Sequence, residues 1–134
     1  MNDKQRELFQ KASEAQKKAH APYSEALIGA AVLMADGTIH VGCNVENASY
    51  GGTVCAERVA IFKAISESSS KQILEVLVVS DSEKPWPPCG FCRQVIAEFA
   101  TEQTLIHTAN LQGKMKTFKF PEIFPEAFTP KHLD

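Results

Sequence analysis

The chain has 134 residues and a formal net charge of -2, and 44% of its residues are hydrophobic. This length suits one globular domain, and we expect residues 1–134 to form it. The charge balance provides no basic surface for a nucleic acid backbone. The longest apolar stretch, ALIGAAVLMA, is too short to cross a bilayer, and no apolar signal segment opens the chain. We therefore expect a cytoplasmic protein with a small-molecule partner, without nucleic acid or membrane partners.

The first third of the chain predicts a helix followed by a hairpin. Helix-forming residues and a narrow apolar stripe predict a helix over residues 3–20. Two apolar segments, 26–35 and 38–45, then predict strands joined across Asp36 and Gly37, a pair that tolerates the backbone angles of a tight turn.

The rest of the chain alternates between helices and strands. We expect helices at 55–66 and 89–100 and strands at 73–80, 104–109 and 116–120. The resulting order, α-β-β-α-β-α-β-β, predicts an α/β fold with three layers, in which helices cover a mixed sheet of about five strands.

Three of the four cysteines stand where predicted helices begin. Cys89 and Cys92 form a C-x-x-C pair whose thiols can face one side of the first helical turn, and Cys55 opens the other helix. Three thiolates that leave a position for water are typical of a catalytic zinc site, so we expect one Zn²⁺ per chain. A redox pair, cysteines without a role, or a structural site completed by Cys43 are the alternatives. Cys43 ends a predicted strand, where a buried free thiol is common.

Three charged residues are close to these cysteines in the sequence. Glu57, two residues after Cys55, can reach water on the metal and act as a general acid and base; the alternative is a carboxylate that only interacts with the helix dipole. Three thiolates and one Zn²⁺ leave an excess negative charge. Arg58 and Arg93 are therefore candidates to donate hydrogen bonds to sulfur, or else they lie in solvent.

Together these segments resemble the cytidine deaminases. CAER and PCGFCRQV, preceded by APYS...GAAV and GCNVENASYG, are similar to the motifs of the short form with all-cysteine zinc ligation, over about residues 20 to 130. The resemblance implies zinc-dependent hydrolytic deamination of cytidine and 2′-deoxycytidine, as in pyrimidine salvage. It assigns zinc to Cys55, Cys89 and Cys92 and the proton transfers to Glu57.

The resemblance also assigns substrate contacts. Asn44 and Glu46 match a pair that binds ribose hydroxyls, for which an amide and a carboxylate offer suitable donors and acceptors; as an alternative, Asn44 only forms a turn. The resemblance also places Ala56 in the substrate site. Phe128 matches a position that closes the site of a neighbouring subunit, so we expect a homotetramer, although the aromatic tail could instead cover its own core.

The sequence departs from the family pattern at two places. After PYS, Glu25, Ala26 and Leu27 replace the usual asparagine, phenylalanine and proline, and Phe91 stands where alanine is usual. We expect Ala26 to leave space in the base pocket and Phe91 to fill part of it, with a core or subunit contact as the alternative for Phe91. Such a pocket would suit modified cytosine nucleosides. Trp86 either braces its proline-rich loop or covers the site entrance.

Other functions remain open at this point. One is deamination of a cytosine-containing antibiotic such as blasticidin S, and another is a non-catalytic module with a structural zinc. The Asn44-Val45-Glu46 triplet favours a ribose-containing ligand over the antibiotic.

Overall fold

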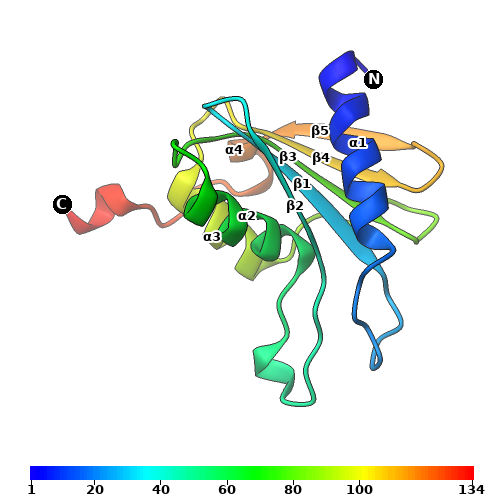
Figure 1. Cartoon of the computed structure of the whole chain (residues 1–134). Helices are drawn as coiled ribbons and strands as arrows, with labels where there is room; N and C mark the ends of the chain where they lie inside the picture. The colour runs from blue at the N-terminus through cyan, green and yellow to red at the C-terminus, as the bar shows by residue number, and fades with distance from the viewer.

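Five strands form one mixed sheet in the order β2-β1-β3-β4-β5 (Figure 1). The structure is a computed structural model that describes residues 1–134. The strands are β1 (Ile28–Met34), β2 (Ile39–Cys43), β3 (Ile73–Ser80), β4 (Leu105–Asn110) and β5 (Met115–Lys119). β3 and β4 are parallel, and the other neighbouring pairs are antiparallel. The predicted α/β fold with a five-stranded mixed sheet is confirmed.

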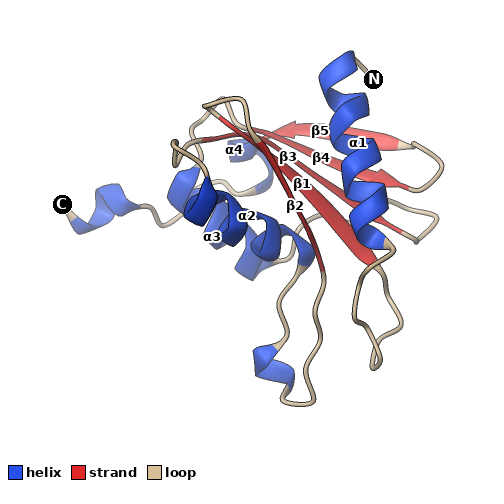
Figure 2. Cartoon of the chain, viewed as in Figure 1, coloured by secondary structure: helices blue, strands red, loops and turns tan.

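Helices cover both faces of this sheet (Figure 2). The α-helices are α1 (Asp3–Gln16), α2 (Ala56–Glu67), α3 (Gly90–Phe99) and the short α4 (Phe120–Ile123), and 3-10 turns occupy Tyr50–Gly52 and Pro130–Leu133. α1 lies on one face, and α2 and α3 lie side by side on the other. A helix long and apolar enough to span a membrane is not found among them.

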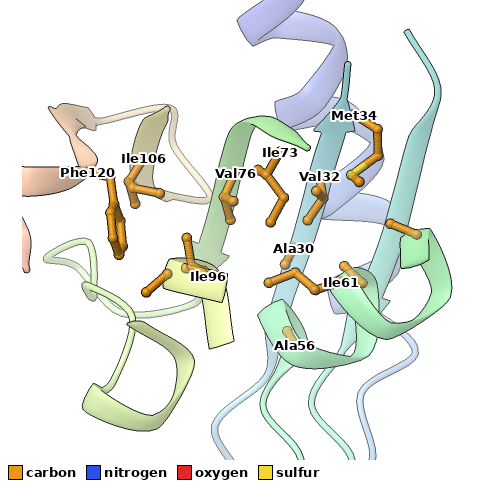
Figure 3. Packing of buried hydrophobic residues seen from close by; sticks show 13 residues of the cluster. Ala30, Val32, Met34, Ala56, Ile61, Ile73, Val76, Ile96, Ile106 and Phe120 are labelled. Carbon is orange, nitrogen blue, oxygen red and sulfur yellow. The ribbon is translucent and has the colours of Figure 1, made fainter. Parts of the chain in front are cut away.

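Strand β1 is buried on both faces, which explains its continuous apolar sequence. Ala30, Val32 and Met34 point towards α2 and α3, whereas Ala31 and Leu33 point towards α1. Figure 3 shows the larger of the two resulting clusters between the sheet and the helices α2 and α3. This packed layer fixes the positions of α2 and α3 on the sheet.

The first helix is shorter than predicted. It ends at Gln16, although the sequence predicts helix to residue 20. Gln16 is buried and its Nε2 donates to the Leu27 carbonyl at 3.1 Å. The chain then runs beside the segment after β2, where the His20 amide donates to the Asn44 carbonyl and the Glu46 amide donates to the His20 carbonyl. Backbone pairing with that segment therefore replaces the last helical turn.

Gly42 sets the position of α2 on the sheet. A Cβ at Gly42 would lie 2.6 Å from the Ala60 nitrogen and 2.7 Å from the Ala56 oxygen, so the β2 and α2 backbones are in direct contact there. Because Ala56 is the first residue of α2, this contact also places the start of the helix.

Replacing Gly42 tests that contact. We expect Gly42→Ala to lower the free energy of unfolding by about 1–3 kcal/mol, because α2 must move away to admit the methyl group. Chemical denaturation measures the change. Gly51→Ala is the matched control, since a Cβ at Gly51 meets nothing within 4 Å. Equal effects of the two substitutions would contradict this account.

Candidate functional site

The N-termini of α2 and α3 carry the three cysteines. Cys55 is the N-cap residue of α2, Cys89 is the N-cap residue of α3, and Cys92 lies in the first turn of α3. Neither N-cap cysteine uses its side chain to cap its helix. The thiols are thus available to a ligand, and the partial positive charge of both helix N-termini favours their ionised form.

The three sulfur atoms fit a zinc ion. They lie within 4.8 Å of one another, and the Cys55 and Cys89 sulfurs are 3.9 Å apart. Tetrahedral zinc bound by thiolates at the usual bond length separates its sulfurs by about 3.8 Å. The predicted three-cysteine cluster is therefore confirmed. Cys43, a free thiol in β2, does not belong to the cluster.

Arg58 lies against this cluster. Its Nη2 is 3.5 Å from the Cys55 sulfur and 3.5 Å from the Thr53 carbonyl oxygen. Hydrogen bonding to the Cys92 thiol, followed by the hydrogen bond and the charge of the Arg58 guanidinium, lowers the pKa of Cys55 to about 5. Cys55 is thus prepared as a thiolate, the form that binds metal.

The expectation that Arg93 donates to sulfur is not met. Its Nε donates to the Pro88 carbonyl at 2.8 Å, and its Nη1 donates to the Ile123 carbonyl. Arg93 instead ties the loop before Cys89 to the α4 segment. The sequence offered no signal for this role, because both acceptors are backbone oxygens.

Glu57 is buried beside the cysteines, with 4% of its surface exposed. It forms no salt bridge. Burial is the main cause that raises the pKa of Glu57 to about 7. A carboxyl group with a pKa near neutrality can both accept and donate a proton.

A cavity of about 400 Å³ joins these groups to the predicted substrate residues. Its wall contains seven of the residues that the sequence assigned to metal, proton transfer or substrate: Ala26, Asn44, Glu46, Cys55, Ala56, Glu57 and Cys89. Ser24, Ile28, Thr53, Val78, Trp86 and Pro87 complete it. The cavity thus connects the metal cluster and the buried carboxyl with an apolar space open to solvent.

Two predicted aromatic residues are absent from this wall. Phe91 does not fill the space beside Ala26, so that prediction is wrong; its ring is 66% exposed and covers Arg58. Phe128 is half exposed in the C-terminal tail, where its ring stacks on His132. Within one chain, Phe128 is therefore separate from the cavity.

Asn44 and Glu46 organise the loop that carries Ala26. The Asn44 amide accepts from the Ile28 nitrogen at 2.9 Å and donates to the Ala26 carbonyl at 2.8 Å. The Glu46 carboxylate accepts from the backbone nitrogens of Tyr23 and Ser24 and from the Ser24 hydroxyl. The hydrogen bonds from Ser24 are the main cause that lowers the pKa of Glu46, so this carboxylate is ionised.

The remaining polar and aromatic residues of the wall had a weak signal or none in the sequence. Trp86, for which the sequence allowed either bracing of its proline-rich loop or covering of the site entrance, lines the cavity. Its place shortly before Cys89 was the available signal. Ser24 and Thr53 are small polar residues in loops, and nothing in their spacing pointed to the site.

Zinc content tests the cluster directly. We expect the folded protein to bind one Zn²⁺ per chain and Cys55→Ser or Cys92→Ser to lose it, because a serine hydroxyl does not replace a thiolate ligand. Cys43→Ser is the matched control and should retain the metal. Elemental analysis after dialysis measures the content. Loss of zinc from Cys43→Ser would show that the site uses a fourth cysteine.

Comparisons with known proteins agree with this geometry. Residues 2–108 match the family described as the cytidine and deoxycytidylate deaminase zinc-binding region. A cytidine deaminase of Halalkalibacterium halodurans is 45% identical over 95% of this chain and 96% of its own length. Among solved structures, cytidine deaminase from Burkholderia pseudomallei is 38% identical with a TM-score of 0.87, covering 96% of this chain and 100% of that one. Cytidine deaminase from Mycobacterium tuberculosis is 33% identical with a TM-score of 0.80, covering 92% and 96%. The chain therefore belongs to the zinc-binding cytidine and deoxycytidylate deaminase family.

Proposed function

We propose that this chain hydrolyses the exocyclic amine of cytidine and 2′-deoxycytidine, giving uridine or 2′-deoxyuridine and ammonia. One observation carries the proposal: a single cavity wall holds Cys55 and Cys89, two of the three clustered cysteines, together with the buried carboxyl group of Glu57. A purely structural zinc site has no need of a proton-transferring acid beside it. The family to which the chain belongs supports the same reaction.

Glu57 is the group that moves protons in this proposal. Zinc, when bound by the three cysteines, supplies Lewis-acid activation of water. Glu57 takes a proton from the attacking water and delivers it to N3 of the base, and a second transfer through the same carboxyl reaches the departing amine. A C4–O bond forms, the C4–N4 bond breaks, and one water is consumed for each ammonia released.

We assign the sugar to the polar side of the cavity. Glu46 is ionised and accepts hydrogen bonds, as sugar hydroxyls require, and Asn44 is buried beside it. The internal hydrogen bonds of Asn44 also make it the residue that fixes Ala26 and Ile28. Ala56 is fully buried in the cavity wall next to Glu57, where its small side chain admits the base.

The part of the cavity beside Ala26, where we place the base, has room for a larger base than cytosine. Ala26 contributes only a methyl group to the wall, and Phe91 does not compensate for it. The space that remains is a reason to propose that cytosine nucleosides with a substituent on N4 are also accepted.

We also propose that the chain forms a homotetramer in which Phe128 reaches the site of a neighbouring copy. The C-terminal tail projects from the body of the chain in Figure 1, and Phe128 and Leu133 on it are 54% and 77% exposed. Another large aromatic side chain, Tyr50, is exposed in the 3-10 turn before α2. Exposed apolar groups of this size are typical of contact surfaces.

Glu57→Gln tests the proposed reaction. We expect it to keep the fold and the zinc but to lower kcat for cytidine by a factor of about 100 to 10,000, because the amide cannot carry the protons. The fall in ultraviolet absorbance as cytosine becomes uracil measures the rate. Glu67→Gln, at the exposed end of the same helix, is the matched control and should keep full activity.

Wild-type protein that retains zinc but leaves cytidine and deoxycytidine unchanged would contradict the proposal. The same assay with blasticidin S separates the antibiotic alternative. Inactivity towards all three substrates would favour a structural zinc module.

Ala26→Phe tests the enlarged base side. We expect it to lower the ratio of kcat/KM for N4-methylcytidine to that for cytidine by about tenfold or more, because the ring occupies the space the methyl group needs. Phe91→Ala is the control and should leave this ratio unchanged, since Phe91 does not line the cavity. An unchanged ratio in Ala26→Phe would contradict the proposal that space beside Ala26 admits N4-substituted cytosine nucleosides.

Light scattering after size exclusion tests the assembly. We expect the mass of four 14.7 kDa chains at micromolar concentration. Phe128→Ala should raise KM for cytidine if the ring closes a neighbouring site. A stable, active monomer would overturn the tetramer.

A further inference from the structure

Phe91 is a large apolar side chain that core packing does not hold. It stands between the metal ligands Cys89 and Cys92 in the first turn of α3, and 66% of it is exposed. Its ring instead contacts Arg58 of α2, whose guanidinium carbon lies 4.2 Å from the ring centroid. At this distance the electron-rich face of the ring attracts the cation.

Few other contacts fix the position of Arg58. Its hydrogen bonds to the Cys55 sulfur and the Thr53 oxygen are both 3.5 Å long, which is long for the oxygen acceptor. Its Nε is buried without a hydrogen-bond partner, and it forms no salt bridge with a carboxylate. An arginine side chain has many accessible rotamers, so these contacts alone hold it weakly. The face of Phe91 adds a further contact that favours the position on sulfur.

The position of the guanidinium affects the charge of the metal site. Three thiolates outnumber the two positive charges of Zn²⁺, and Arg58 supplies the balancing charge beside Cys55. Its attraction for the cluster falls steeply once the guanidinium moves into water. A cluster without this balance holds its metal less well.

We propose that Phe91 is a positioning residue whose ring holds the Arg58 guanidinium against the Cys55 sulfur and thereby slows the loss of zinc. The contact joins α3 to α2, the two helices that carry the ligands. The inference deepens the proposed function and rests on it, because it concerns the metal that the deamination requires.

A double-mutant cycle on the zinc-loaded protein tests the proposal. The measurement is the rate of zinc transfer to the chelator 4-(2-pyridylazo)resorcinol at fixed pH and low ionic strength. Phe91→Leu keeps apolar bulk but removes the ring, and should release zinc about two- to fivefold faster, the factor expected from an exposed cation–π pair. In Arg58→Gln, zinc should leave faster than in wild type, and adding Phe91→Leu should change the rate no further.

Aromatic replacements and a spectroscopic signature separate this role from plain packing. Phe91→Trp and Phe91→Tyr keep an aromatic face and should retain the wild-type rate. In protein loaded with Co²⁺, the sulfur-to-cobalt charge-transfer absorption should shift in the same direction in Phe91→Leu and Arg58→Gln. Phe118→Leu, a change of the same kind in β5, is the control and should alter neither measurement. Circular dichroism and light scattering verify that each variant keeps its fold and assembly.

Two results would overturn the proposal. In the first, Phe91→Leu accelerates zinc release by the same factor in the wild-type and Arg58→Gln backgrounds; in the second, it has no effect in the wild-type background. Neither measurement uses a nucleoside. A protein that fails these tests can still deaminate cytidine, and a protein inactive on cytidine can still pass them.

Discussion

The meeting of two helix N-termini at one point is the constraint on which the site depends. Cys55 comes from the start of α2, and Cys89 and Cys92 come from the start of α3, so the ligands converge only if the sheet places both helices correctly. The contact at Gly42 fixes one helix against β2, and the apolar cluster beneath α2 and α3 holds both. The geometry of the metal site is thus a property of the packed layer below it.

The meeting of the two helix N-termini also determines the ionisation of the thiols and of Glu57. Several thiols and a carboxyl group lie close together, and such a group of acids is unfavourable unless positive charge or protons compensate. The helix dipoles and Arg58 supply positive charge, whereas Glu57 responds to burial by holding its proton more tightly. Two acids of one helical turn are therefore driven in opposite directions, Cys55 towards its anion and Glu57 towards its neutral form.

The sequence predicted the long elements and the ligand set well because their signals are local. Apolar periodicity located the helices and strands to within a few residues, and the C-x-x-C spacing together with Cys55 identified the cluster. The end of α1 was placed too late, because its limit depends on pairing with residues 44–46, which are distant in the sequence. Phe91 and Arg93 were misplaced for a related reason. Residue type and spacing do not tell which of several neighbours a long side chain will contact.

The hydrogen bonds of Glu46 have a consequence for affinity. Its carboxylate already accepts three hydrogen bonds from the loop at Tyr23 and Ser24, and a carboxylate has about four acceptor positions. A sugar that donated two hydroxyls to Glu46, as in the proposed site, would therefore displace an internal donor, and the Ser24 hydroxyl is the one free to rotate away. In the proposed sugar site, recognition at this carboxylate would be an exchange of partners: the net gain would be the difference between two similar hydrogen bonds, and sugar binding would loosen the loop at Ser24.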